Sequence, residues 1–163
     1  MNPKTRWDAP TLIARLGLEP LEPEGGWFRE TWRTPGAGRT ASTAIYYLLT
    51  AGTCSAMHRL AGADEVFHFY LGDPVELLLL HEGGGATLAV LGPDLAAGQH
   101  LQLVVPRATW QGAVLVPGGA FALMGTTCAP AFDYADCEFA RGDELIARWP
   151  SQEIAIRARL PRA

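Results

Sequence analysis

Short apolar segments, each ended by a turn that contains glycine or proline, run through most of this chain. Seven of them follow one another: Ser42–Thr50, Glu65–Leu71, Val75–His81, Thr87–Leu91, Leu101–Val105, Ala113–Val116 and Ala120–Thr127. Turns such as Gly72-Asp73-Pro74 separate them, and the alternating bulk of Trp27–Arg33 predicts one more strand before them. Many short strands with little helix between them indicate an all-β antiparallel barrel or sandwich rather than a parallel sheet.

Helical patterns are confined to the two ends of the chain. Asp8, followed by Pro10 and the apolar stripe of Leu12, Ile13 and Leu16, predicts a short capped helix that stops near Gly17. After the strands, we expect one turn of helix over Glu144–Arg148 and a second helix over Gln152–Leu160, capped by Ser151. With 163 residues, 48% of them hydrophobic, the sequence predicts a single domain over residues 1–163, whose barrel covers about residues 24–140.

Charge and composition argue against polymeric and membrane partners. The net charge is −4 and the basic residues are scattered, which disfavours nucleic acid and anionic membrane surfaces. No apolar stretch has the length of a membrane span or the form of a signal peptide, so we expect a cytoplasmic protein. Three cysteines at spacings that fit no zinc pattern are expected to be buried, reduced thiols.

The segment Ser55–Gly72 carries the residues most suited to chemistry. His58 is followed by Glu65 at the start of a strand-like run that ends at Gly72. In a regular strand Glu65, Phe67 and Phe69 share one face, while Val66, His68 and Tyr70 share the other. A carboxylate on an apolar face is costly unless a cation or a hydrogen-bond donor meets it, so we expect Glu65 to have a partner.

Two motifs together resemble those of the cupin superfamily. His58, Glu65 and Gly72 match the first motif, and Gly98 with the run from Val105 to Gln111 matches the second. The phrases PEGGWFRETWR, STAIYYLL, MHRLAGADEVFHFYLG, VVPRATWQGA and ALMGTTCAPAFDYADCEFA are similar to the fifth cupin family, a domain of unknown function. The resemblance implies a jelly-roll barrel, a double-stranded β-helix, that is commonly a homodimer. It also implies a small-molecule pocket and structural kinship with deoxysugar epimerases.

The chain departs from the cupin pattern at the metal ligands. Leu60 and Gln111 stand where the superfamily has its second and third histidines, and Glu22 stands where the branch commonly has another histidine. His58, Glu65 and Gln111 are therefore the candidate ligands for a divalent metal, although a first-row ion usually takes more imidazole. His68 could replace a missing ligand only if a β-bulge turned it to the face of Glu65.

Three readings of the pocket remain open. The first is a metal-free isomerase or epimerase for a sugar-like or carbonyl substrate, in which His58 removes a proton and Glu65 orients it. By the resemblance to the epimerases a tyrosine acid is also needed, for which Tyr46, Tyr47 and Tyr70 are candidates. The second is a non-catalytic ligand-binding or sensor barrel. The third is a metal-dependent oxygenase or hydrolase.

Further side chains are candidates for binding the ligand. Arg29 and Arg59 could hold an anionic group in a bidentate way, and Trp110 could stack on a flat ring. The remaining candidates are Tyr46, Phe67 and Gln111. For the two arginines the competing explanation is a surface ion pair, and for Trp110 it is packing of the barrel.

Overall fold

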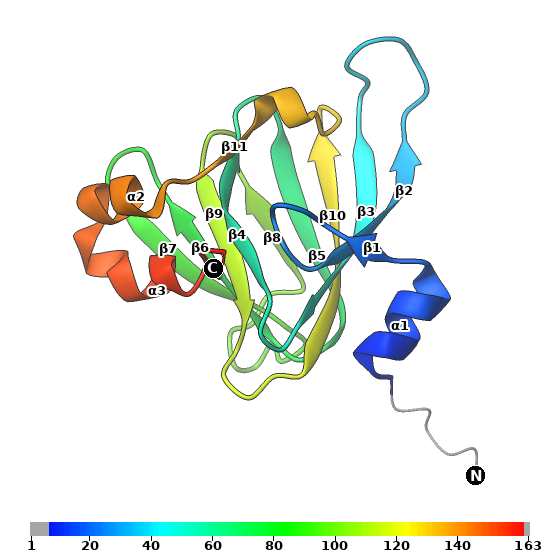
Figure 1. Ribbon diagram of the computed structural model, residues 1–163, viewed down its shortest axis with the longest axis horizontal. Coiled ribbons are helices and arrows are strands. Elements are labelled where there is room, and N and C mark those ends of the chain that lie inside the picture. The colour runs from blue at the N-terminus through cyan, green and yellow to red at the C-terminus, as the bar shows by residue number, and fades with distance from the viewer. Residues whose placement is uncertain (1–6, 162–163) are drawn as a thin grey trace.

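The computed structural model describes residues 7–161 and consists of two antiparallel β-sheets that face each other (Figure 1). The first sheet has the order β1 (Glu19–Pro20), β2 (Trp27–Arg33), β3 (Thr43–Thr50), β10 (Phe121–Ala129), β5 (Asp64–Gly72) and β8 (Gln102–Val105). The second has the order β11 (Cys137–Phe139), β4 (Cys54–Leu60), β9 (Trp110–Leu115), β6 (Val75–Leu80) and β7 (Ala86–Leu91). The predicted all-β class is confirmed.

Helices cover the outer faces of both sheets, at opposite sides of the molecule (Figure 1). Helix α1 (Ala9–Leu16) begins where Asp8 accepts a hydrogen bond from the Thr11 amide at 2.9 Å, as predicted, and packs Leu12 against Leu48 of β3. At the other side α2 (Gly142–Arg148) and α3 (Glu153–Arg157) lie against sheet residues such as Met57 and Trp110. The predicted cap at Ser151 is wrong, because Ser151 lies within a 3-10 turn, Pro150–Gln152, and α3 starts at Glu153.

Arg159 ties the end of the chain to the second sheet. Its side chain is 1% exposed and donates to the carbonyl oxygens of Gly112, Ala155 and Glu76 at 2.9–3.1 Å. Its own carbonyl accepts from the Met57 amide at 2.9 Å. A single buried guanidinium thus satisfies acceptors on β6, β9 and α3.

The barrel core lies between the two sheets and follows the predicted alternation. Glu65, Phe67 and Phe69 of β5 are buried, whereas Tyr70 is 49% exposed. Phe67 packs with Tyr47, Leu77 and Met124 in the main hydrophobic cluster. The face assignment of β5 is therefore confirmed, and Glu65 lies inside the barrel with the aromatic side chains.

Strand β4, which carries His58, was not predicted as a strand. It is buried along both faces, because its outer face lies under α2 and α3, so its sequence shows no clear alternation. The pairing of β4 with β9 shifts by one residue between Ser55, opposite Ala113, and His58, opposite Gln111. This bulge places both Ser55 and His58 on the inner face, although three positions separate them.

None of the helices within residues 7–161 has the length and apolar character needed to cross a membrane.

Candidate functional site

A cavity of about 480 Å³ opens at one end of the barrel. Its wall is formed by β2, β3, β4, β5, β10, β11 and the loops at that end, and its lining residues include Glu24, Phe28, Tyr47, His58, Glu65, Thr126, Cys128, Phe132, Cys137 and Phe139. The volume lies within the range of small-molecule sites, and a few polar groups converge among aromatic walls. His58 and Glu65, both predicted as catalytic, lie together in this cavity.

The backbone fixes the tautomer of His58. Its Nδ1 lies 2.7 Å from the carbonyl oxygen of Ala56, and the ring is 3% exposed. A carbonyl oxygen can only accept, so Nδ1 carries the proton and donates. In the neutral ring Nε2 then keeps its lone pair, and it lies 4.0 Å from Oε2 of Glu24. His58 is thereby held as a proton acceptor at the cavity.

Glu65 is a buried carboxyl with a fixed donor. Gln111 donates from Nε2 to Oε2 of Glu65 at 2.7 Å. Burial raises the pKa of Glu65, and the negative charge of Glu24 raises it further, while His58 and the hydrogen bonds from Thr126 and Gln111 oppose that rise. The net direction is upward, which favours the proton-carrying form compared with an exposed glutamate.

Replacing Glu65 by glutamine should therefore change how stability depends on pH. A raised pKa in the folded state means that the carboxyl favours folding below its unfolded value, close to 4.5, and that this contribution is lost as pH rises through the folded pKa. We expect Glu65→Gln to gain stability relative to the parent protein between about pH 4 and neutrality. Urea denaturation across this range measures it, with the exposed Glu19→Gln as control; parallel curves for Glu65→Gln and the parent would contradict it.

Sequence reasoning missed Glu24 as a site residue. It lies in the turn before β2, and Ser55 donates to its Oε1 at 2.6 Å. The turn lies tightly against β4: Gly25 has φ of +100°, and a Cβ there would lie 2.3 Å from the Cys54 carbonyl oxygen. The signal was the Glu-Gly-Gly step, since paired glycines allow a loop to approach a strand closely and bring its preceding side chain inward.

Of the three candidate tyrosines, Tyr47 is the one that lines the cavity. Its hydroxyl donates to the Gly25 carbonyl oxygen at 2.8 Å, and burial raises its pKa well above the ordinary value. Tyr46 lies on the opposite face of β3, where it packs edge-on against Tyr70 with ring centroids 6.2 Å apart. The period of two along a strand separates these neighbours.

Removing the Tyr47 hydroxyl tests how firmly the Glu24 turn is held. We expect Tyr47→Phe to lower the free energy of unfolding by about 1 kcal/mol, because the Gly25 carbonyl loses its donor while the ring still fills the core. Urea denaturation measures this loss. The partly exposed Tyr46→Phe should change stability less, and an equal loss in both variants would contradict the assignment.

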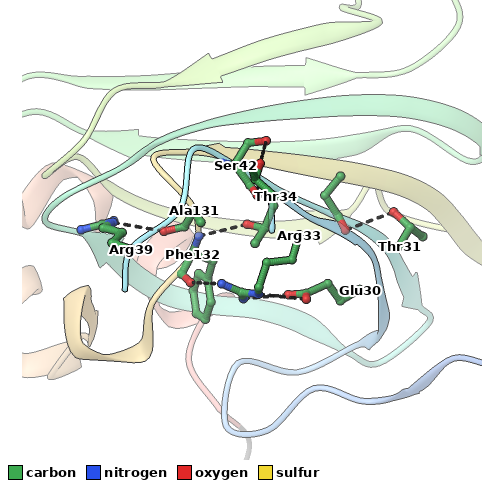
Figure 2. Close-up of polar contacts among 10 residues, drawn as sticks. Glu30, Thr31, Arg33, Thr34, Arg39, Ser42, Ala131 and Phe132 are labelled. Carbon is green, nitrogen blue, oxygen red and sulfur yellow. Dashed lines mark hydrogen bonds and ion pairs between the residues drawn. The ribbon is translucent and has the colours of Figure 1, made fainter. Parts of the chain in front are cut away.

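Two arginines border the mouth, and both are engaged in contacts. Arg33 donates to Glu30 at 2.8 and 3.0 Å and to the Phe132 carbonyl oxygen at 3.2 Å. Arg39, in the loop between β2 and β3, pairs with Asp136 and donates to the Ala131 carbonyl oxygen at 3.2 Å. Figure 2 shows the contacts of Arg33 with Glu30 and Phe132 and the contact of Arg39 with Ala131.

Most of the predicted ligand-binding residues lie outside this cavity. Arg29 is exposed and lies over the Tyr46 ring. The guanidinium carbon of Arg59 lies 4.6 Å from the centroid of the Trp110 ring. Arg59 also forms an ion pair with Glu138. Trp110 belongs to the cluster beneath α2 and α3. Phe67 is part of the core between the sheets, and Gln111 reaches the site through Glu65. Arg59 and Trp110 thus take the ion-pair and packing arrangements that competed with ligand binding.

The donor set does not fit a metal ion of the cupin type. Within residues 7–161, no group of three or more histidine, cysteine, aspartate or glutamate side chains is arranged to hold a metal. His68 stays on the outer face of β5, where it contacts Thr127 and Gln102, because no bulge lies between it and Glu65. Gln111 directs its amide nitrogen, a hydrogen-bond donor that cannot ligate a metal, at Glu65.

Two cysteines also line the cavity, and neither has the environment of a nucleophile. Burial raises the pKa of Cys128 and raises that of Cys137 to about 12. A thiol with a raised pKa carries little thiolate at neutral pH. Both residues pack in a small apolar cluster with Leu60 and Ala63.

The barrel has two antiparallel sheets and a polar pocket at one end, with His58 on one sheet and Glu65 on the other. These features are those of a cupin. The chain belongs to the Cupin 5 family (DUF985) of the cupin superfamily, and the model of this family matches residues 10–140. A search of curated proteins gave no match.

Solved structures support the same assignment. A protein from Shewanella oneidensis is 32% identical, with a TM-score of 0.88 over 96% of this chain and 99% of its own. A hypothetical protein from Leishmania major is 27% identical, with a TM-score of 0.86 over 96% and 100% of the two chains. KdgF from Halomonas sp. is 19% identical, with a TM-score of 0.53 over 71% and 87%, and shares the fold alone.

Proposed function

We propose that the barrel cavity is a metal-free acid/base site that moves a proton on a small carbonyl compound, as an isomerase or epimerase does. The observation that carries this proposal is the hydrogen bond from His58 Nδ1 to the Ala56 carbonyl oxygen, which leaves Nε2 at the cavity as a base. An imidazole whose Nε2 lone pair is left available in this way suits proton abstraction.

The proposed step uses His58 as the base and Glu65 as the acid. His58 Nε2 takes the proton from the carbon beside the carbonyl, and the C–H bonding pair forms the carbon–carbon double bond of an enol. The carbonyl oxygen receives a proton from Glu65, whose raised pKa suits a donor and whose carboxyl is held in place by Gln111. The enol hydroxyl then gives its proton back as carbon is reprotonated: delivery by His58 to the neighbouring carbon gives the shifted carbonyl, and delivery from water to the opposite face of the original carbon gives the epimer. No oxidant or metal is required.

Solvent-deuterium incorporation tests this reaction class directly. The purified protein is incubated in deuterated buffer with neutral ketoses and aldoses, amino sugars and keto acids, and the carbon-bound deuterium is read by mass spectrometry. We expect incorporation beside the carbonyl with at least one class. No incorporation with any of them would contradict the proposal.

The alternative is a barrel that binds a ligand without turning it over. The observation that favours it is that both inner carboxyls are held by fixed hydrogen bonds, Glu24 by Ser55 and Glu65 by Gln111, which would also suit a rigid receptor. A pure binding protein should gain thermal stability with a ligand that acquires no deuterium, because binding to the native state raises apparent stability.

A further inference from the structure

The charge of the cavity restricts the ligand that the proposed site can take. Its lining contains the acidic side chains Glu22, Glu24, Glu30, Glu65 and Asp133 and, within residues 7–161, the basic side chains Arg33 and Arg39. Both arginines lie at the mouth, in contact with Glu30 and Asp136. No guanidinium or ammonium group of the described chain therefore meets the two inner carboxyls, Glu24 and Glu65, and an anionic group would be repelled there.

The polar atoms that face each other at His58 are hydrogen-bond acceptors. Glu24 Oε2 and His58 Nε2 face each other at 4.0 Å, which is too long for a direct hydrogen bond. Buried acceptors of this kind are normally met by a donor, and an ammonium group carries three.

We propose that the ligand carries a protonated amino group on the carbon next to its carbonyl, and that Glu24 binds this group. A carbon bonded to nitrogen lies about 1.5 Å from it. A nitrogen within hydrogen-bond distance of Glu24 Oε2 therefore brings that carbon, and the proton on it, close to His58 Nε2. The substrate class is an α-amino carbonyl compound, such as the open-chain form of a 2-amino sugar; this inference rests on the proposed function.

The rest of the cavity agrees with such a ligand. Aromatic rings of Phe28, Tyr47, Phe132 and Phe139 line it, and aromatic faces favour cations as well as sugar rings. The neutral form of Glu65 serves as proton donor and leaves Glu24 as the inner anion, so the two carboxyls take different roles. The pocket is large enough for a monosaccharide, at about 480 Å³.

The inference is tested by binding measurements, which do not depend on turnover. Matched series are titrated at neutral pH by calorimetry and thermal shift: ethanolamine, ethylene glycol and glycolate, then glucosamine, glucose and glucuronate. We expect the amine of a series to bind about tenfold or more tightly than its neutral counterpart, and the carboxylate not at all. Glu24→Gln should remove the preference, while Glu19→Gln, the same charge change on exposed β1, should keep it.

Several binding results would overturn the inference. Equal binding of amine and neutral counterparts, no binding of any amine up to 100 mM, preference for the carboxylates, or an amine preference that survives in Glu24→Gln would each do so. Tight stoichiometric binding of manganese or zinc, lost in Glu24→Gln, would reassign the acidic groups to a metal. An amine preference without deuterium incorporation would instead refute the proposed reaction and retain the ligand class.

Discussion

Replacing His58 by glutamine is expected to lower deuterium incorporation about 10²- to 10⁴-fold, with little loss of stability. Glutamine can fill the buried position and donate to the Ala56 carbonyl oxygen, so the strand is preserved. It cannot take a proton, and a positioned acid or base usually contributes a factor of this size. The measurement is the initial rate of incorporation into the substrate found for the parent protein.

His68→Gln is the matched control for this variant. His68 lies on the outer face of β5 and contacts Thr127 and Gln102, outside the cavity. We expect its rate to stay within about twofold of the parent protein. If both variants lost activity equally, or if His58→Gln kept the parental rate while remaining folded, His58 would not be the base.

Replacing Arg159 by methionine is expected to lower the free energy of unfolding by about 3 kcal/mol or more. Methionine keeps the apolar stem, but the buried carbonyl oxygens of Gly112 and Glu76 lose their donor, and each unsatisfied buried acceptor costs about 1–3 kcal/mol. The carboxylate of Glu76 is 31% exposed and regains water, which limits the loss. Urea denaturation measures the effect.

A neighbouring arginine provides the comparison. Arg157 of α3 pairs with Glu153, and its side chain is 63% exposed, so Arg157→Met should change the free energy of unfolding by about 0.5 kcal/mol or less. Hydrogen exchange adds a local readout, since Arg159→Met should speed exchange of the Met57 amide, which bonds to the Arg159 carbonyl oxygen. Equal stabilities for both variants would contradict the anchoring role of Arg159.

The strands could be predicted wherever turns interrupt the sequence and one face is more exposed than the other. Glu65–Leu71 was expected and became Asp64–Gly72, with its inward and outward faces as predicted. Strand β4 was missed because the C-terminal helices bury its outer face, so no alternation of polar and apolar residues marks it. Burial by segments about 100 positions later in the chain is a tertiary effect that a local pattern does not carry.

The site was predictable in part, for a similar reason. His58 and Glu65, chosen from residue type and spacing, both line the cavity, and Glu65 lies inside the barrel as expected. Tyr46 was chosen where its neighbour Tyr47 lines the cavity, because the direction of each face depends on which side α1 covers. Glu24 was missed because its place in the site depends on a turn folding back onto Ser55, 31 residues away.

The bulge in β4 determines that Ser55 and His58 lie on the same face of the strand. The extra residue brings Ser55, the partner of Glu24, and His58 onto the same wall. In a regular strand without the bulge, residues three positions apart point to opposite faces, so one of the two would face the α2 and α3 helices instead. The backbone irregularity of β4 therefore determines whether the proposed base and the partner of its carboxylate neighbour lie on one wall of the barrel.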